Sequence, residues 1–80
     1  MQIQVLLFAS YADAFDAPEL QVALDDGATV KELLARVQQM AAGQALPPSP
    51  MVAVNRCYAA ADVRIRAGDE VALIPPVAGG

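Results

Sequence analysis

Glu70-Val71-Ala72-Leu73-Ile74-Pro75-Pro76-Val77-Ala78-Gly79-Gly80 is the stretch that decides the fold of this chain. Residues 70–74 read as a strand whose apolar Val71 and Leu73 belong in the middle of a sheet. The strand ends at Ile74, because the two prolines that follow lack the N–H that a β-ladder needs and favour polyproline II geometry. We therefore expect this last strand to lie beside the first strand of the chain.

The residues after this strand form a thin peptide without reactive side chains. Because glycine has no β-carbon, Gly79 and Gly80 can enter a channel that is too narrow for other residues. The reactive group of such a tail would be the carboxyl carbon of Gly80, which is ionised at neutral pH and needs activation by another enzyme. The alternative is a frayed terminus, since the ends of most domains are disordered. We expect a domain over residues 1–74 and a tail over residues 75–80, and threading would involve Pro75, Pro76, Val77, Ala78 and Gly79.

Apolar spacing upstream predicts a strand over residues 2–8 and a second one over residues 20–24, which a turn at residues 25–27 ends. The segment between these strands could include a helical turn. Thr29 and Glu32 have the spacing of a helix-capping box. An apolar stripe then extends along the predicted helix, which Gly43 would end. The stripe comprises Val30, Leu33, Leu34, Val37 and Ala41.

Beyond a proline-rich loop at residues 44–50, the pattern predicts a short strand over 51–54 and a tight turn at Asn55-Arg56. Charged residues alternate with Val63 and Ile65 over 62–66, which predicts a further short strand or an irregular piece. The order is therefore β, β, α, β, a short piece and β. This order predicts an α+β domain of the ubiquitin-like β-grasp kind, with a mixed sheet and one main helix packed on one face.

Composition excludes several functional classes. The chain has 80 residues, a net charge of −4, one cysteine and no histidine. An acidic chain without a basic cluster is a poor nucleic-acid binder, and one cysteine cannot build a disulfide framework or a Cys/His metal site. Cys57 is expected to be an ordinary packed or surface thiol. No apolar run reaches the roughly 20 residues of a membrane span, and no signal-peptide pattern opens the sequence, so a cytoplasmic location is expected.

The polar face of the first strand does not stay polar. Gln2 and Gln4 are followed on the same side by Leu6 and Phe8, and Glu70 on the last strand is likewise followed by Ala72 and Ile74. Either the strands enter a two-sided core here, or an exposed apolar patch lies where the tail leaves the sheet. On the second interpretation, Phe8, Tyr58 and Ile74 form a surface on which a partner docks.

Residues 68–80 resemble the ending of the small, sulfur-carrying subunits of molybdopterin synthase, which are ubiquitin-like β-grasp proteins. Gly-Asp-Glu-Val followed by Ile-Pro-Pro-Val-Ala-Gly-Gly carries the resemblance. It extends over the whole chain at Phe8-Ala9, Thr29-Val30, Val54-Asn55 and Asp62. The sequence departs from the family in two places. Asp13-Ala14 stands near the position of a frequent Arg-Glu pair, and Leu73-Ile74 stands where an aromatic residue is common.

The resemblance implies a sulfur carrier that catalyses no reaction itself. An ATP-dependent enzyme similar to those that activate ubiquitin would adenylate the Gly80 carboxylate, and a sulfur donor protein would convert it to a 1-glycyl thiocarboxylate. The tail would then enter the large subunit of a heterotetrameric synthase, where the sulfur passes to a cyclic pyranopterin. The resemblance implies no metal and no permanently bound cofactor, because the activating enzyme is the component that uses ATP.

Two other classes of function remain open at this point. One is a sulfur carrier for thiamine or another sulfur-containing metabolite, or a ubiquitin-like modifier that is joined to lysines. The other is a β-grasp interaction module whose terminus has no function.

Overall fold

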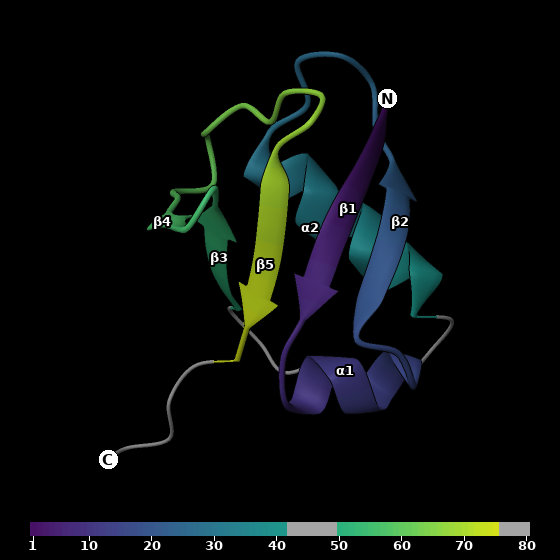
Figure 1. The fold of residues 1–80 in the computed structure, drawn as a ribbon. Coiled ribbons are helices and arrows are strands. Elements are labelled where there is room, and N and C mark those ends of the chain that lie inside the picture. The colour runs from purple at the N-terminus through teal and green to yellow at the C-terminus, as the bar shows by residue number, and fades with distance from the viewer. Residues whose placement is uncertain (42–49, 76–80) are drawn as a thin grey trace.

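A five-stranded mixed sheet with a long helix across one face forms the body of the computed structural model, which describes residues 1–41 and 50–75 (Figure 1). The strands are β1 (Gln2–Leu7), β2 (Glu19–Ala23), β3 (Met51–Val54), β4 (Cys57–Tyr58) and β5 (Glu70–Ile74). The helices are α1 (Ser10–Phe15) and α2 (Val30–Met40).

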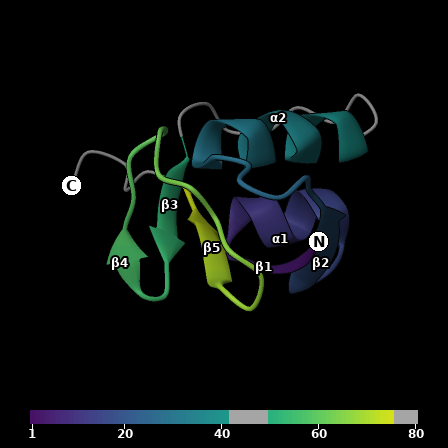
Figure 2. The same ribbon diagram turned by 90° about the horizontal axis from the view of Figure 1, so that it is seen from above.

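The strand order in the sheet is β2-β1-β5-β3-β4. β1 and β5 are parallel neighbours, with Leu7 opposite Leu73, and the other neighbouring pairs are antiparallel. The prediction that the last strand lies beside the first is confirmed. Figure 2 shows α2 lying over one face of the sheet, and no helix of the described residues crosses the opposite face, which we call the helix-free face.

The long helix begins as the sequence predicts. Thr29 is the N-cap in an extended conformation, and its hydroxyl accepts the backbone N–H of Glu32 at 3.4 Å. The helix ends with Ala41 as its C-cap, and the expected stop at Gly43 lies outside the described residues. One member of the predicted stripe differs from expectation, because Leu34 is only partly buried whereas Leu33 is fully buried.

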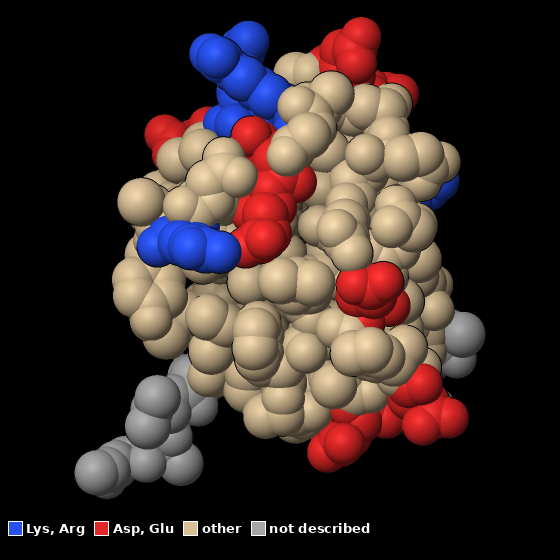
Figure 3. Space-filling model, viewed as in Figure 1, with Lys and Arg blue, Asp and Glu red and all other residues tan. Residues whose placement is uncertain are grey.

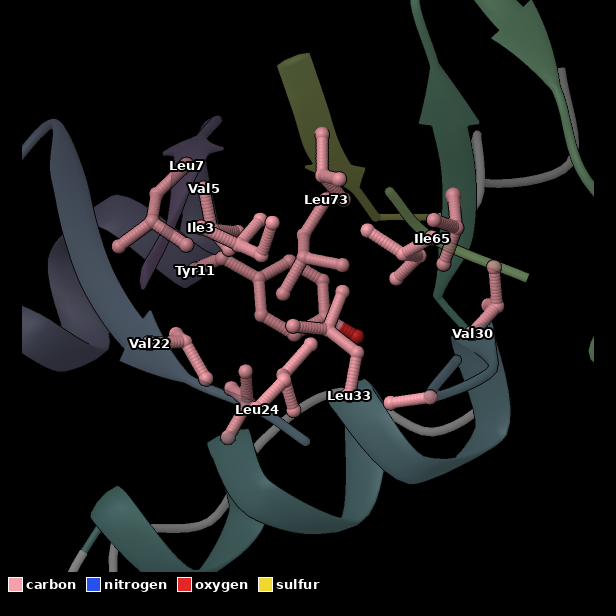
Figure 4. Close-up of a cluster of buried hydrophobic side chains, with 14 residues drawn as sticks. Ile3, Val5, Leu7, Tyr11, Val22, Leu24, Val30, Leu33, Ile65 and Leu73 are labelled. Carbon is pink, nitrogen blue, oxygen red and sulfur yellow. The ribbon is translucent and has the colours of Figure 1, made fainter. Parts of the chain in front are cut away.

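The core lies between the sheet and α2, and it is built almost entirely from aliphatic side chains (Figure 4). Val5, Val71 and Leu73 are completely buried on the central strands. Tyr11 of α1 is 1% exposed, and Figure 4 shows its ring in the middle of the cluster. Burial raises the pKa of the Tyr11 hydroxyl. Each fully buried aliphatic side chain stabilises the fold by roughly 1.5–3 kcal/mol, so these strands are held firmly under the helix.

Residues 62–66 do not form a regular strand, and β4 lies at Cys57–Tyr58 instead. The Asn55-Arg56 turn folds the chain back on β3 at once, so the extra strand comes earlier than the charge alternation suggested. Residues 62–66 instead line the start of α2, where Ile65 donates its N–H to Ala28 at 2.8 Å and is itself buried. Cys57 is exposed, which agrees with the surface alternative for that thiol.

Candidate docking surface

The helix-free face of the sheet carries a row of apolar residues across four strands. The register sets Leu6 of β1 opposite Ala72 of β5, Ala72 opposite Ala53 of β3, and Ala53 opposite Tyr58 of β4. These residues alternate along their strands with the buried residues that face α2, so their side chains belong to the other face. The row therefore crosses the sheet on the side away from the helix.

A second row lies one step closer to the start of the tail. Ile74 is in register with Met51 on β3. Phe8 directly follows β1, and its N–H donates to the carbonyl of Leu73 at 3.3 Å, so it continues the parallel pairing beside Ile74. Phe8 is 48% exposed and Tyr58 is 70% exposed. The interpretation as a two-sided core is therefore wrong for this face, and the exposed apolar patch is confirmed as a feature of the fold.

Between these rows the surface is hollowed. The hollow has a volume of about 370 Å³. Its apolar lining consists of Leu6, Phe8, Ala53, Tyr58, Ala72 and Ile74, and we call it the docking hollow. It exists because Ala53 and Ala72 are methyl-sized at its centre while larger side chains surround them. The structure thus brings together Phe8, Tyr58 and Ile74, which the sequence proposed as one surface.

The remaining lining residues, Arg56 and Glu70, make one edge of the docking hollow polar. The Nε of Arg56 is 3.9 Å from Oε1 of Glu70, and the two side chains are 89% and 47% exposed. Figure 3 shows this face of the molecule: charged side chains flank an uncharged area over the ends of β1 and β5. An apolar centre with a charged edge is the usual anatomy of a protein–protein interface.

The turn that carries Arg56 has an unusual backbone. Asn55 and Arg56 both have positive φ, 51° and 70°, as a two-residue type I′ hairpin requires. Asparagine tolerates this region of conformational space, whereas arginine adopts it rarely. The sequence predicted the turn from Asn55, but it gave no indication of the strained arginine.

A hydrogen-bonded clamp fastens this turn to the start of β5. The Asn55 amide donates to Oδ1 of Asp69 at 2.9 Å, and its oxygen accepts the N–H of Glu70 at 3.0 Å. The other carboxylate oxygen of Asp69 accepts the N–H of Arg66 at 2.8 Å. The two bonds that the Asp69 carboxylate accepts, from Arg66 and from Asn55, lower its pKa. The bond from the Arg66 backbone has the larger effect. The local sequence around Asp69 gives no signal for this contact, because its partner Asn55 is 14 positions away.

The tail begins at the docking hollow. Ile74 is both the last residue of β5 and part of the lining, and Pro75 follows it, half-buried. Figure 1 shows the end of β5 beside the end of β1, where Phe8 follows. The predicted threading residues Pro76, Val77, Ala78 and Gly79 and the predicted reactive residue Gly80 lie outside the described residues.

Within residues 1–41 and 50–75, no cluster of three or more histidine, cysteine, aspartate or glutamate residues could hold a metal ion. In the same ranges, neither helix is long and apolar enough to cross a membrane.

Comparisons with known proteins agree with this geometry. The model of a family described as the ThiS family matches residues 5–80. A curated relative from Chlamydomonas reinhardtii, named molybdopterin synthase sulfur carrier subunit, is 38% identical over 85 residues, which cover 100% of both chains. The resemblance that the sequence carries in residues 68–80 is thereby confirmed.

Two solved structures have the same fold. The small archaeal modifier protein 1 of Haloferax volcanii has a TM-score of 0.81 at 28% identity, covering 95% of this chain and 98% of that chain. A chain of the protein–protein complex of subunits 1 and 2 of molybdopterin-converting factor from Helicobacter pylori 26695 has a TM-score of 0.67 at 24% identity, with 100% of both chains covered. These likenesses confirm the predicted ubiquitin-like β-grasp.

Proposed function

The chain belongs to the ThiS family, and on that premise we propose that it is the sulfur-carrying subunit of a molybdopterin synthase, with Gly80 as the carrying residue. The full-length relative at 38% identity has that role in its name, which favours this pathway among those open to the family. The structural observation that carries the proposal is the position of Ile74. Ile74 lines the docking hollow and the tail starts one residue later, so a partner seated in the hollow would hold the start of the tail.

The chemistry follows from the tail. A carboxylate is a poor electrophile, so an ATP-dependent activating enzyme joins the Gly80 carboxylate to AMP and releases pyrophosphate. A donor protein then supplies sulfur in the sulfide oxidation state, which attacks the acyl carbon and displaces AMP. The result is a thiocarboxylate, in which sulfur replaces one carboxylate oxygen. In this scheme the catalytic side chains belong to the partner enzymes, since Gly79 and Gly80 at the reacting end have no side chains.

The docking hollow orients this thiocarboxylate toward the large subunit. Phe8 and Tyr58 are large and exposed, and such aromatic side chains often dominate the binding energy of an interface. With the hollow covered, the tail reaches into the large subunit and delivers its sulfur to a cyclic pyranopterin. The fold is compatible with this arrangement, since the Helicobacter pylori protein was solved in a complex of subunits 1 and 2.

A second candidate function is that of a ubiquitin-like modifier. It is favoured by the Haloferax volcanii structure, which is described as a small archaeal modifier protein. An activated Gly80 carboxyl would then form an amide with a lysine of another protein. A carrier for thiamine or another sulfur-containing metabolite would share the thiocarboxylate but use a different acceptor. The acceptor therefore distinguishes the three.

The experiment measures the intact mass of the protein before and after incubation with the activating enzyme, ATP and a sulfur donor. The starting mass tests whether Gly80 is the terminal residue, and after incubation we expect the mass to increase by the difference between one sulfur and one oxygen. The sulfurated protein is then mixed with the large subunit and cyclic pyranopterin, and molybdopterin should form. Sulfuration without molybdopterin would favour another carrier pathway, and stable amide conjugates would favour the modifier.

A further inference from the structure

We propose that Arg56 is a specificity-determining residue of the docking hollow, and that it binds a carboxylate of the partner. The inference rests on the proposed function, because it takes the large subunit as that partner. It deepens that function by assigning a charged contact to an otherwise apolar surface. Nothing in the apolar lining itself fixes the rotation of a partner, whereas a directional charge pair does.

The backbone of Arg56 supplies the first argument. Its φ of 70° is one that residues with a side chain seldom adopt, and glycine is favoured at the second position of such a turn. The side chain gives little stability in return, because it is 89% exposed and its ion pair with Glu70 is long, at 3.9 Å. The turn therefore requires a positive φ at position 56 but does not require an arginine there, so the reason for this side chain lies outside the stability of the fold.

The location of Arg56 supplies the second argument. It lines the same hollow as Phe8 and Tyr58, and it lies beside Glu70 at the start of β5, whereas the tail follows the end of that strand. The Asn55 clamp, with bonds of 2.9 and 3.0 Å to Asp69 and Glu70, fixes the turn from which its side chain extends. The backbone from which the guanidinium extends is therefore held at a defined place at the edge of the docking hollow.

The chemistry of the side chain identifies what it binds. A guanidinium offers five N–H donors in a planar fork that matches a carboxylate, and a single contact at 3.9 Å leaves most of them available. Glu70 lies beside the group without saturating it. Once a partner covers the hollow and excludes water, a pair between Arg56 and a partner carboxylate becomes stronger than it would be at an open surface. The chain has a net charge of −4, so a positive group beside the apolar centre is a distinctive feature of this surface. A partner carboxylate can recognise it.

The test measures the dissociation constant for the large subunit of the same organism at low and at high salt. Arg56→Gly removes the side chain and relieves the positive φ, so we expect melting at an equal or higher temperature but binding at least fivefold weaker at low salt. Arg56→Glu should weaken binding at least tenfold. Arg36→Glu makes the same change in net charge on the exposed face of α2, where Arg36 contacts Gln39 at 3.4 Å, and should alter binding less than twofold.

High salt should reduce the difference between wild type and Arg56→Gly, because a pair of charges is screened. The proposal is overturned if both Arg56 variants bind like wild type, or if the loss in Arg56→Gly is the same at high salt. These outcomes leave the proposed function intact as long as the wild type binds the large subunit and Phe8→Asp does not. If the wild type does not bind the large subunit, the proposed function is wrong and this inference is wrong with it.

Discussion

Leu6 of β1 lies directly opposite Ala72 of β5 on the helix-free face of the sheet. A large side chain beside a methyl group leaves space above the smaller residue, and Ala53 on the other side of Ala72 enlarges that space. The depth of the docking hollow therefore depends on two alanines, both of which sit in strands that the core holds from the opposite face.

Filling this space should prevent docking without unfolding the domain. Ala72→Leu places a larger side chain in the centre of the docking hollow, and we expect binding to the large subunit to weaken more than tenfold, because the partner's side chains no longer fit. Ala23→Leu is the matched control, since Ala23 is exposed on the edge strand β2 and does not line the hollow. Calorimetric titration with the large subunit measures both. Wild-type affinity in Ala72→Leu would show that the partner does not enter the hollow.

A charge introduced where the tail leaves the sheet should also weaken docking, but for a different reason. Phe8→Asp or Ile74→Asp would require a carboxylate to lose its water within an apolar contact, so we expect the complex to weaken more than tenfold. Phe8 is 48% exposed, so the isolated domain should remain folded by circular dichroism. Val63→Asp introduces the same charge at a residue that is 37% exposed and outside the docking hollow, and it should bind normally.

The stability of the domain should depend on Leu33 more than on Leu34. Leu33 is fully buried, so Leu33→Ala should cost about 2–5 kcal/mol of unfolding free energy, a large fraction for a domain of this size. Leu34→Ala should cost clearly less, because that side chain is only partly buried at the margin of the core. Denaturant titration of the two variants provides the comparison. An equal loss in both would mean that the two side chains contribute equally to the core.

The residues that were predicted correctly are those whose positions follow from local periodicity. Alternation along β1 and β5 gave both the core side and the exposed apolar side, and capping at Thr29 gave the start of α2. The distinction between Leu33 and Leu34 was missed because helical periodicity assigns both to the apolar stripe, whereas tertiary packing decides how deeply each is buried.

Longer-range features had no local signal. The clamp between Asn55 and Asp69 joins residues 14 positions apart, and nothing in either neighbourhood predicts the contact. The place of β4 was missed because a strand of two residues is too short for any periodicity. The positive φ of Arg56 follows from the two-residue turn. The sequence predicted the position of this turn but not its backbone geometry.

The clamp makes stability depend on pH in a defined direction. Hydrogen bonds from Arg66 and Asn55 lower the pKa of Asp69 in the folded protein. A carboxyl group with a lowered folded pKa stabilises the fold at neutral pH, and this contribution is lost as the pH falls from the unfolded pKa through the folded one. We expect Asp69→Asn to melt below the wild type at neutral pH, with the difference shrinking in acid. Thermal melts over a pH series measure this, and a constant difference would contradict it.

The tail should tolerate neither added length nor added bulk. One residue after Gly80 displaces the activated carbon by up to about 3.5 Å, and reacting groups need near-contact alignment. Replacing Gly79 by a bulkier residue should block the passage of the tail by steric clash. Both changes lie beyond the last strand of the fold, so we expect the melting temperature to be unchanged. Intact mass spectrometry after incubation with activating enzyme, ATP and a sulfur donor should show the wild type gaining one sulfur in place of one oxygen, and the extended variant gaining none. An extended chain that is sulfurated at its new terminus and supports molybdopterin formation at the wild-type rate would exclude Gly80 as the carrying residue.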